Sequence, residues 1–122
     1  MNIKTAKVYR DRYGFSVIPL KGNKRPYSSL LPLDKEGKPT WKPYQTRRAT
    51  DEELREWFGK KHEGIMIGIC TGELSNLAVV DFDDKKLVSN ELIDESKTPI
   101  ASTPRGYHFY FEYWKAYLTL LT

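Results

Sequence analysis

Apolar residues recur at helical spacing near the N-terminus, at Ile3, Ala6, Tyr9 and Tyr13. This spacing predicts a first helix that ends near Gly14. A second helix is predicted after Thr50, because Thr50 followed by Glu53 is a capping-box pattern. The apolar stripe of this second helix consists of Leu54, Trp57 and Phe58. Gly59 is placed to end it.

Short apolar runs between these helices and after them predict strands. We expect strands over residues 15–19, 65–70, 77–83 and 107–112. A loose helix is predicted over residues 84–97, where apolar residues return at helical spacing within a polar segment. Strands that adjoin through short turns, with separate helices, indicate an α+β fold with a mostly antiparallel sheet and helices on one face.

The strand patterns also predict which side chains share a face. In the third predicted strand, Asp81 and Asp83 alternate with apolar residues and therefore project from the same face. In the last strand, His108 alternates with an aromatic set on the opposite face, Tyr107, Phe109 and Phe111. If both strands lie in one sheet, Asp81, Asp83 and His108 lie on one face, with their side-chain groups within about 10 Å.

Length and composition narrow the class of protein. The chain of 122 residues is expected to form one domain, residues 1–122. Its one cysteine, Cys70, leaves no internal disulfide and no structural zinc spacing. This cysteine usage fits a reducing cytoplasm, and no apolar run approaches the length of a membrane span. We therefore expect a cytoplasmic chain that does not contact a membrane.

The net charge of +4 is unevenly distributed, because basic residues crowd the first half of the chain. They are Lys21, Lys24, Arg25, Lys35, Lys38, Lys42, Arg47 and Arg48. Aromatic residues interleave with them at Tyr27, Trp41 and Tyr44. Cations beside aromatic faces suit a phosphate backbone with stackable bases. A solvated loop with ordinary lysines is the alternative reading. We expect Lys24, with Arg47 or Arg48, to line the same groove as Asp81.

Asp81 and Asp83 are the candidate metal ligands. Two carboxylates at this spacing on a strand lie about 6–7 Å apart at the backbone, and their oxygens can converge on a hard cation such as Mg²⁺. The alternative is that the strand ends in acidic turn residues, which Asp84 continues.

His108 and Arg105 are the candidate phosphate contacts. The guanidinium of Arg105 offers a planar fork to phosphate oxygens, and the imidazole of His108 adds a further donor. Thr103 supplies a hydroxyl near the same strand end, and Gly106 lets backbone approach a ligand. Plain turn chemistry is the alternative for the threonine.

Six segments in one order and spacing resemble a known family. They are Ile18-Pro19 with Gly22, Lys24 and Pro26; Trp41 with Tyr44-Gln45; Ile67-Gly68-Ile69; Thr71-Gly72; Val79-Val80-Asp81-Phe82-Asp83; and Thr103-Pro104-Arg105-Gly106-Tyr107-His108. Together they resemble the N-terminal domain of bifunctional DNA primase–polymerases, from about residue 8 to residue 112. That family belongs to the archaeo-eukaryotic primase superfamily and is frequent in plasmids, phages and other mobile elements.

The resemblance implies an RRM-like sheet with a preceding α/β unit, and it implies roles for individual residues. Asp81 and Asp83 would hold catalytic Mg²⁺ or Mn²⁺, and His108 would contact the triphosphate of the incoming nucleotide, with Arg105 beside it. Lys24 would contact nucleotide or template. The expected partners are nucleoside triphosphates, a single-stranded DNA template and a replicative helicase. The implied reaction is template-directed synthesis of primers or DNA, which needs no covalent enzyme nucleophile.

The C-terminal end departs from the family pattern. A third metal-binding acid would follow the histidine on a later strand, but only Glu112 remains before an apolar tail. The chain is therefore expected to be a truncated or a degenerate relative. Two other functions stay open: a nucleotide or single-strand binding module without turnover, and a metal-dependent nuclease.

Overall fold

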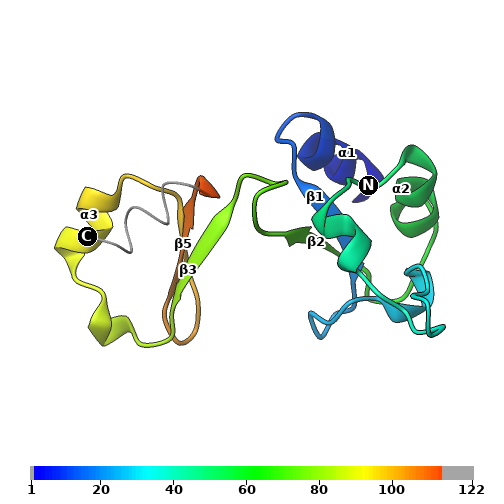
Figure 1. Ribbon diagram of the computed structural model, residues 1–122. Helices are drawn as coiled ribbons and strands as arrows, with labels where there is room; N and C mark the ends of the chain where they lie inside the picture. The colour runs from blue at the N-terminus through cyan, green and yellow to red at the C-terminus, as the bar shows by residue number, and fades with distance from the viewer. Residues whose placement is uncertain (1, 114–122) are drawn as a thin grey trace. The chain divides into compact units, whose positions relative to one another are not determined.

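The computed structural model describes residues 2–113, and the chain forms two compact units, Met1–Ser75 and Asn76–Thr122 (Figure 1). Each unit contains one antiparallel sheet: strands β1 and β2 in the first, and strands β3, β5 and β4 in the second. The predicted α+β class and antiparallel pairing are confirmed. The strands are divided between two sheets instead of joining in one. The tail from residue 114 onward lies outside the described residues.

The first unit opens with helix α1 (Asn2–Asp11) and strand β1 (Ser16–Leu20). The turn between them includes Gly14 in the left-handed region, with φ at 72°, which glycine adopts without steric cost. Strand β2 (Met66–Cys70) pairs with β1 in antiparallel register. A Cβ on Gly68 of β2 would lie only 2.6 Å from Leu20 Cγ, so a larger residue there would require the Leu20 side chain to move.

Helix α2 (Asp51–Phe58) begins with the predicted capping box. The Thr50 hydroxyl accepts from the Glu53 backbone N–H, and the Glu53 carboxylate accepts from the Thr50 backbone N–H. The apolar stripe of this helix enters the core of the unit with residues of β1 and the preceding loop. The core contains Ala6, Val17, Ile18, Leu31, Tyr44, Ala49, Leu54, Trp57, Phe58 and Cys70.

The long basic loop before α2 is ordered by two short 3₁₀ helices, η1 (Ser28–Leu30) and η2 (Lys42–Gln45). Each contacts Trp57 of α2. The indole N–H of Trp57 donates to the Leu30 carbonyl over 3.0 Å, and Tyr44 of η2 packs edge-on against Trp57. The loop is therefore attached to α2 at two points.

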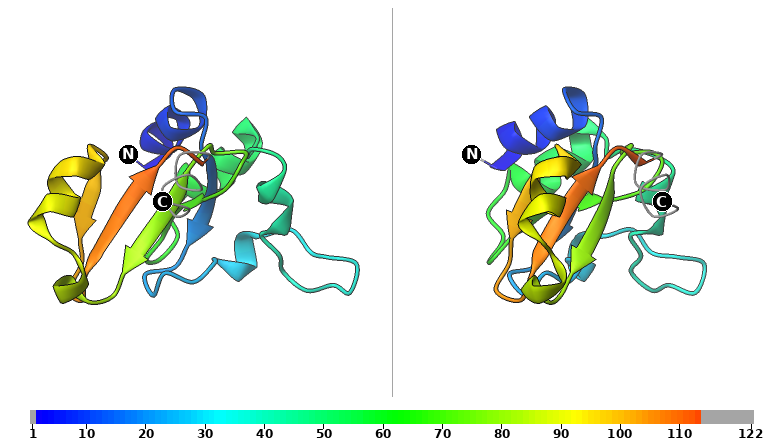
Figure 2. Two further views of the ribbon diagram at one scale, coloured as in Figure 1. Left: turned by 60° about the vertical axis from the view of Figure 1, so that its left-hand side comes forward. Right: turned by 90° about the vertical axis from the view of Figure 1, so that its left-hand side faces the viewer.

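The second unit contains β3 (Ala78–Phe82), the 3₁₀ turn η3 (Lys85–Leu87), helix α3 (Asn90–Ser96), β4 (Ile100–Ser102) and β5 (Tyr107–Phe111). The order is β3-β5-β4, with β5 in the centre and both pairs antiparallel. Helix α3 lies next to β4 in both views of Figure 2.

Two details differ from the sequence expectations. The helix predicted over 84–97 is divided, because the Asp84 carboxylate caps η3 and the Ser89 hydroxyl caps α3 separately. Strand β4 was not predicted, because a strand of three residues carries too short an apolar pattern. No helix among residues 2–113 has the length and apolar character to cross a membrane.

Candidate functional site

Asp81 and His108 meet on neighbouring strands of the second unit. They are register partners in the β3–β5 pair, and opposite residues of an antiparallel pair project from the same face. The imidazole Nε2 of His108 lies 3.4 Å from a carboxylate oxygen of Asp81. The aromatic face stands opposite, where Phe82 and Phe109 pack edge-on. The predicted placement of Asp81 and His108 on one face is therefore confirmed.

This pair contributes little to the stability of the fold. The side chains of His108 and Asp81 are 38 % and 53 % exposed. An ion pair this open to water is worth about 0–1 kcal/mol. Both groups remain accessible to a ligand, which a buried structural pair would not be.

A tight turn carries Thr103 and Arg105 to the end of β3. The Thr103 backbone N–H donates to the Gly106 carbonyl over 2.8 Å, and the Gly106 N–H donates to the Thr103 hydroxyl oxygen over 2.9 Å. Gly106 rests on the Phe82 carbonyl, and a Cβ there would overlap that oxygen. Arg105 is exposed within this turn. The turn thus brings the threonine-to-histidine segment against the Asp81-Phe82-Asp83 segment.

Asp83 lies one residue past the end of β3, and its side chain is exposed. The next residue, Asp84, has a local role, because its carboxylate accepts the Lys86 backbone N–H over 2.9 Å. The acidic-turn interpretation therefore describes Asp84. Asp83 follows directly after the strand that positions Asp81.

The carboxylates of Asp81 and Asp83 offer a divalent ion hard oxygen donors, but only a small number of them. Carboxylate oxygens match the preference of Mg²⁺ and Mn²⁺. Within residues 2–113, however, no three His, Cys, Asp or Glu side chains gather around a common point. A metal site at Asp81 and Asp83 therefore stays a prediction, and an ion bound there would need further ligands from a phosphate or from water.

Lys24 belongs to the first unit, in a tight loop between Lys21 and Arg25. Its N–H donates to the Lys21 carbonyl, and the Lys21 N–H donates to the Arg25 carbonyl, both over 2.8 Å. Lys24 is exposed and has φ at 68°, a left-handed conformation that is uncommon for a residue with a Cβ. The loop therefore presents this lysine to solvent.

The two arginines of the first unit make internal contacts. Arg48 donates to the backbone carbonyls of Gly14 and Leu74, over 2.9 and 3.0 Å. Arg47 pairs with Glu53 over 2.7 Å and lies over the Tyr44 ring, at 4.7 Å from its centroid. Both arginines thus hold the loop to the rest of the unit. A common groove with Asp81 stays a prediction.

Glu53 also accepts the Tyr44 hydroxyl. The pKa of Tyr44 is raised, mainly by burial and secondly by the hydrogen bond to Glu53. Burial alone would raise the pKa of Glu53, but the hydrogen bonds from Arg47, Tyr44 and the Thr50 backbone outweigh it and hold that pKa below its ordinary value. The ionised carboxylate therefore joins the loop to the start of α2.

Glu53→Gln is expected to lower the free energy of unfolding at neutral pH by about 2 kcal/mol, because charge-assisted hydrogen bonds are lost. A lowered pKa in the folded state gives stability that is present above the ordinary pKa of about 4.3 and is lost as pH falls through the folded value. The wild type should therefore lose more stability than the variant between neutral pH and acid. Denaturant unfolding over a pH series measures this. Glu52→Gln, on the exposed neighbour, is the control and should change little.

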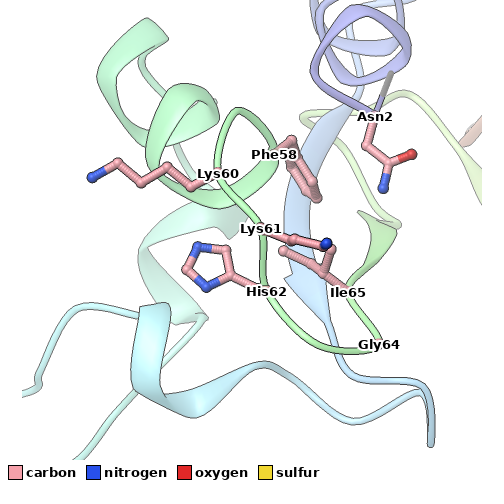
Figure 3. A pocket seen from close by; sticks show the side chains of 7 residues that line it. All are labelled: Asn2, Phe58, Lys60, Lys61, His62, Gly64 and Ile65. Carbon is pink, nitrogen blue, oxygen red and sulfur yellow. The ribbon is translucent and has the colours of Figure 1, made fainter.

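One basic group was missed by the sequence analysis. Lys60, Lys61 and His62 follow α2 and line a hollow of about 370 Å³ with Asn2, Phe58, Gly64 and Ile65 (Figure 3). The available signal was a basic run bounded by Gly59 and Gly64.

The comparison with known protein families identifies the family of the chain. The sequence matches the family described as bifunctional DNA primase/polymerase, N-terminal, over residues 6–118. The match covers most of the 122 residues, and the chain belongs to this family. No curated protein and no solved structure matches the chain.

Proposed function

We propose that this chain is a metal-dependent nucleotide-binding domain for template-directed synthesis of primers or DNA. Asp81 and Asp83 would hold Mg²⁺ or Mn²⁺, and His108, Arg105 and Thr103 would contact the nucleotide triphosphate. The observation that carries the proposal is the exposed Asp81–His108 pair at 3.4 Å. It joins the acidic segment and the histidine segment of the family on one sheet face.

Each residue type suits a separate part of the task. Arg105 can bind phosphate oxygens through its planar fork, and the imidazole of His108 can donate a further hydrogen bond. A bound divalent ion would activate the attacking hydroxyl and stabilise the charge on the leaving pyrophosphate.

The small number of acidic ligands favours nucleotide binding over efficient synthesis. Mg²⁺ demands near-octahedral geometry, and residues 2–113 supply no cluster of three acidic or histidine ligands. We therefore infer weak, metal-dependent triphosphate binding with poor primer synthesis. A binding module derived from the family is the second candidate, and the same ligand count favours it. The expected template is single-stranded DNA, the expected further partner is a replicative helicase, and the expected compartment is the cytoplasm.

Titration calorimetry of a nucleoside triphosphate, with and without Mg²⁺ or Mn²⁺, tests this function. Asp81→Asn is expected to weaken metal-dependent binding by about tenfold, the effect of losing one charge-assisted ligand. Asp94→Asn, on exposed Asp94 of α3, is the matched control and should bind as the wild type does. A primer-synthesis assay and a strand-cleavage assay run beside it.

Three results would each contradict one part of the proposal: the metal site, the poor synthesis or the class of reaction. Binding that is unaffected by Asp81→Asn and by chelation of the metal would refute the metal site. Robust primer synthesis that Asp81→Asn abolishes would show that another acid completes the site. Metal-dependent strand cleavage would assign the pair to a nuclease.

A further inference from the structure

Two loops of the first unit are joined into one surface. The Tyr27 hydroxyl donates to the Glu63 carbonyl over 3.0 Å, and the Tyr27 ring packs edge-on against His62. Gly22 and Gly64 are also neighbours, since a Cβ on Gly22 would make an ordinary contact, 3.8 Å, with the Gly64 carbonyl oxygen. The segments 21–27 and 60–65 therefore form a single, mutually supported surface, which we name the two-loop surface.

The two-loop surface is strongly basic. Its cationic side chains are Lys21, Lys24, Arg25, Lys60 and Lys61, and all five residues are exposed. Two carboxylates lie among them: Glu56, which pairs with Lys60 over 2.7 Å, and Glu63. An excess of cations remains after these are counted, and it attracts phosphate at long range.

The arrangement suits an extended ligand. The lysines are spread over two loops, whereas a single triphosphate would need them to converge. Lys21 lies over the Tyr27 ring, at 5.5 Å from its centroid. The hollow beside Lys61 is open to solvent and lined by Asn2, Phe58 and Ile65 (Figure 3). Cations interleaved with aromatic and apolar faces along a groove are typical of single-strand binding.

His62 is fixed in this surface. Its Nε2 lies 2.8 Å from the Glu56 carbonyl oxygen at the C-terminal end of α2. A carbonyl oxygen only accepts, so Nε2 carries the hydrogen. The other ring nitrogen, Nδ1, is directed away from this contact, and the ring edge against Tyr27 holds its orientation.

We propose that the two-loop surface binds the phosphate backbone of a single nucleic-acid strand, with Lys21 and Lys61 as principal contacts. This inference rests on the proposed function, because it assigns the strand to the first unit and leaves the triphosphate with Asp81 and His108. The same cationic side chains could bind the phosphates of a strand or those of a free nucleotide. The experiment therefore measures the binding of each ligand.

The test is fluorescence anisotropy of a labelled single-stranded oligonucleotide over a salt series, beside calorimetry of a nucleoside triphosphate. Lys21→Gln combined with Lys61→Gln is expected to weaken strand binding by about tenfold at moderate salt, and to reduce the slope of log K against log salt by about 1.4, since each lost contact removes roughly 0.7. Triphosphate binding should be unchanged. Lys35→Gln with Lys38→Gln is the control, since it removes equal charge from the exposed turn at 34–38.

Two outcomes overturn the inference. If the control weakens strand binding equally, general charge is responsible and the two-loop surface is no site. If the Lys21 and Lys61 variant weakens triphosphate binding instead, the surface holds a nucleotide. The Asp81→Asn variant tests the proposed function separately. It is expected to weaken triphosphate binding and to leave strand binding intact.

Discussion

Trp57→Ala is expected to destabilise the first unit by about 3–5 kcal/mol, the range measured for removing a buried tryptophan. The Trp57 side chain is 2 % exposed. It packs edge-on against both Tyr44 and Phe58, and its indole donates to the Leu30 carbonyl. Truncation therefore opens a cavity and also leaves that carbonyl without its donor.

A domain of this size has about 5–15 kcal/mol of stability in total, so the loss should be visible as a large shift in the denaturant midpoint. Trp41→Ala is the matched control, because Trp41 is 37 % exposed. It should cost less than about 1 kcal/mol. Equal effects of the two substitutions would show that Trp57 does not anchor the basic loop to α2.

Gly106→Ala is expected to destabilise the sheet of the second unit by about 3 kcal/mol or more. A Cβ there would overlap the Phe82 carbonyl oxygen, and a backbone atom cannot rotate away as a side chain can. Overpacking in a well-packed interior commonly costs about 1–3 kcal/mol, and a clash with backbone should lie at the top of that range. Amide exchange of β5, with thermal unfolding, measures the loss.

Gly22→Ala is the control for this substitution. Its Cβ would make an ordinary contact, 3.8 Å from the Gly64 carbonyl oxygen, and it should change stability by less than about 1 kcal/mol. Unchanged protection of the β5 amides in Gly106→Ala would mean that the turn does not rest on the end of β3. Another contact would then have to hold the threonine-to-histidine segment against the Asp81-Phe82-Asp83 segment.

The placement of Asp81 and His108 was predictable from local pattern. Residues 77–83 and 107–112 alternate apolar and ionisable side chains, and alternation fixes which residues share a face. The exact partnership of Asp81 with His108 was not predictable, because register depends on the turns between the strands. Here the chain between β3 and β5 passes through η3, α3 and β4, and the Thr103–Gly106 turn joins β4 to β5.

The arginines show where sequence reasoning ends. Basic charge in the loop predicts ligand contacts for Arg47 and Arg48, and these stay a prediction. The pattern did not indicate their contacts with the protein itself. The Arg48 contact with Gly14 joins residues 34 positions apart, and no local pattern carries that information. The capping box at Thr50 is the opposite case, because Thr50 and Glu53, three positions apart, contain all of its determinants.

The strand order holds the three candidate site residues with unequal firmness. His108 lies on central strand β5, between Asp81 on one side and Ala101 on the other. Asp81 lies on β3, which among the described residues pairs with β5 alone. Asp83 lies past the end of that strand. Positional freedom therefore increases from the imidazole to the first carboxylate to the second. If Asp81 and Asp83 hold the ion as proposed, their oxygen atoms can adjust to ions of different radius while His108 keeps its place beside the nucleotide.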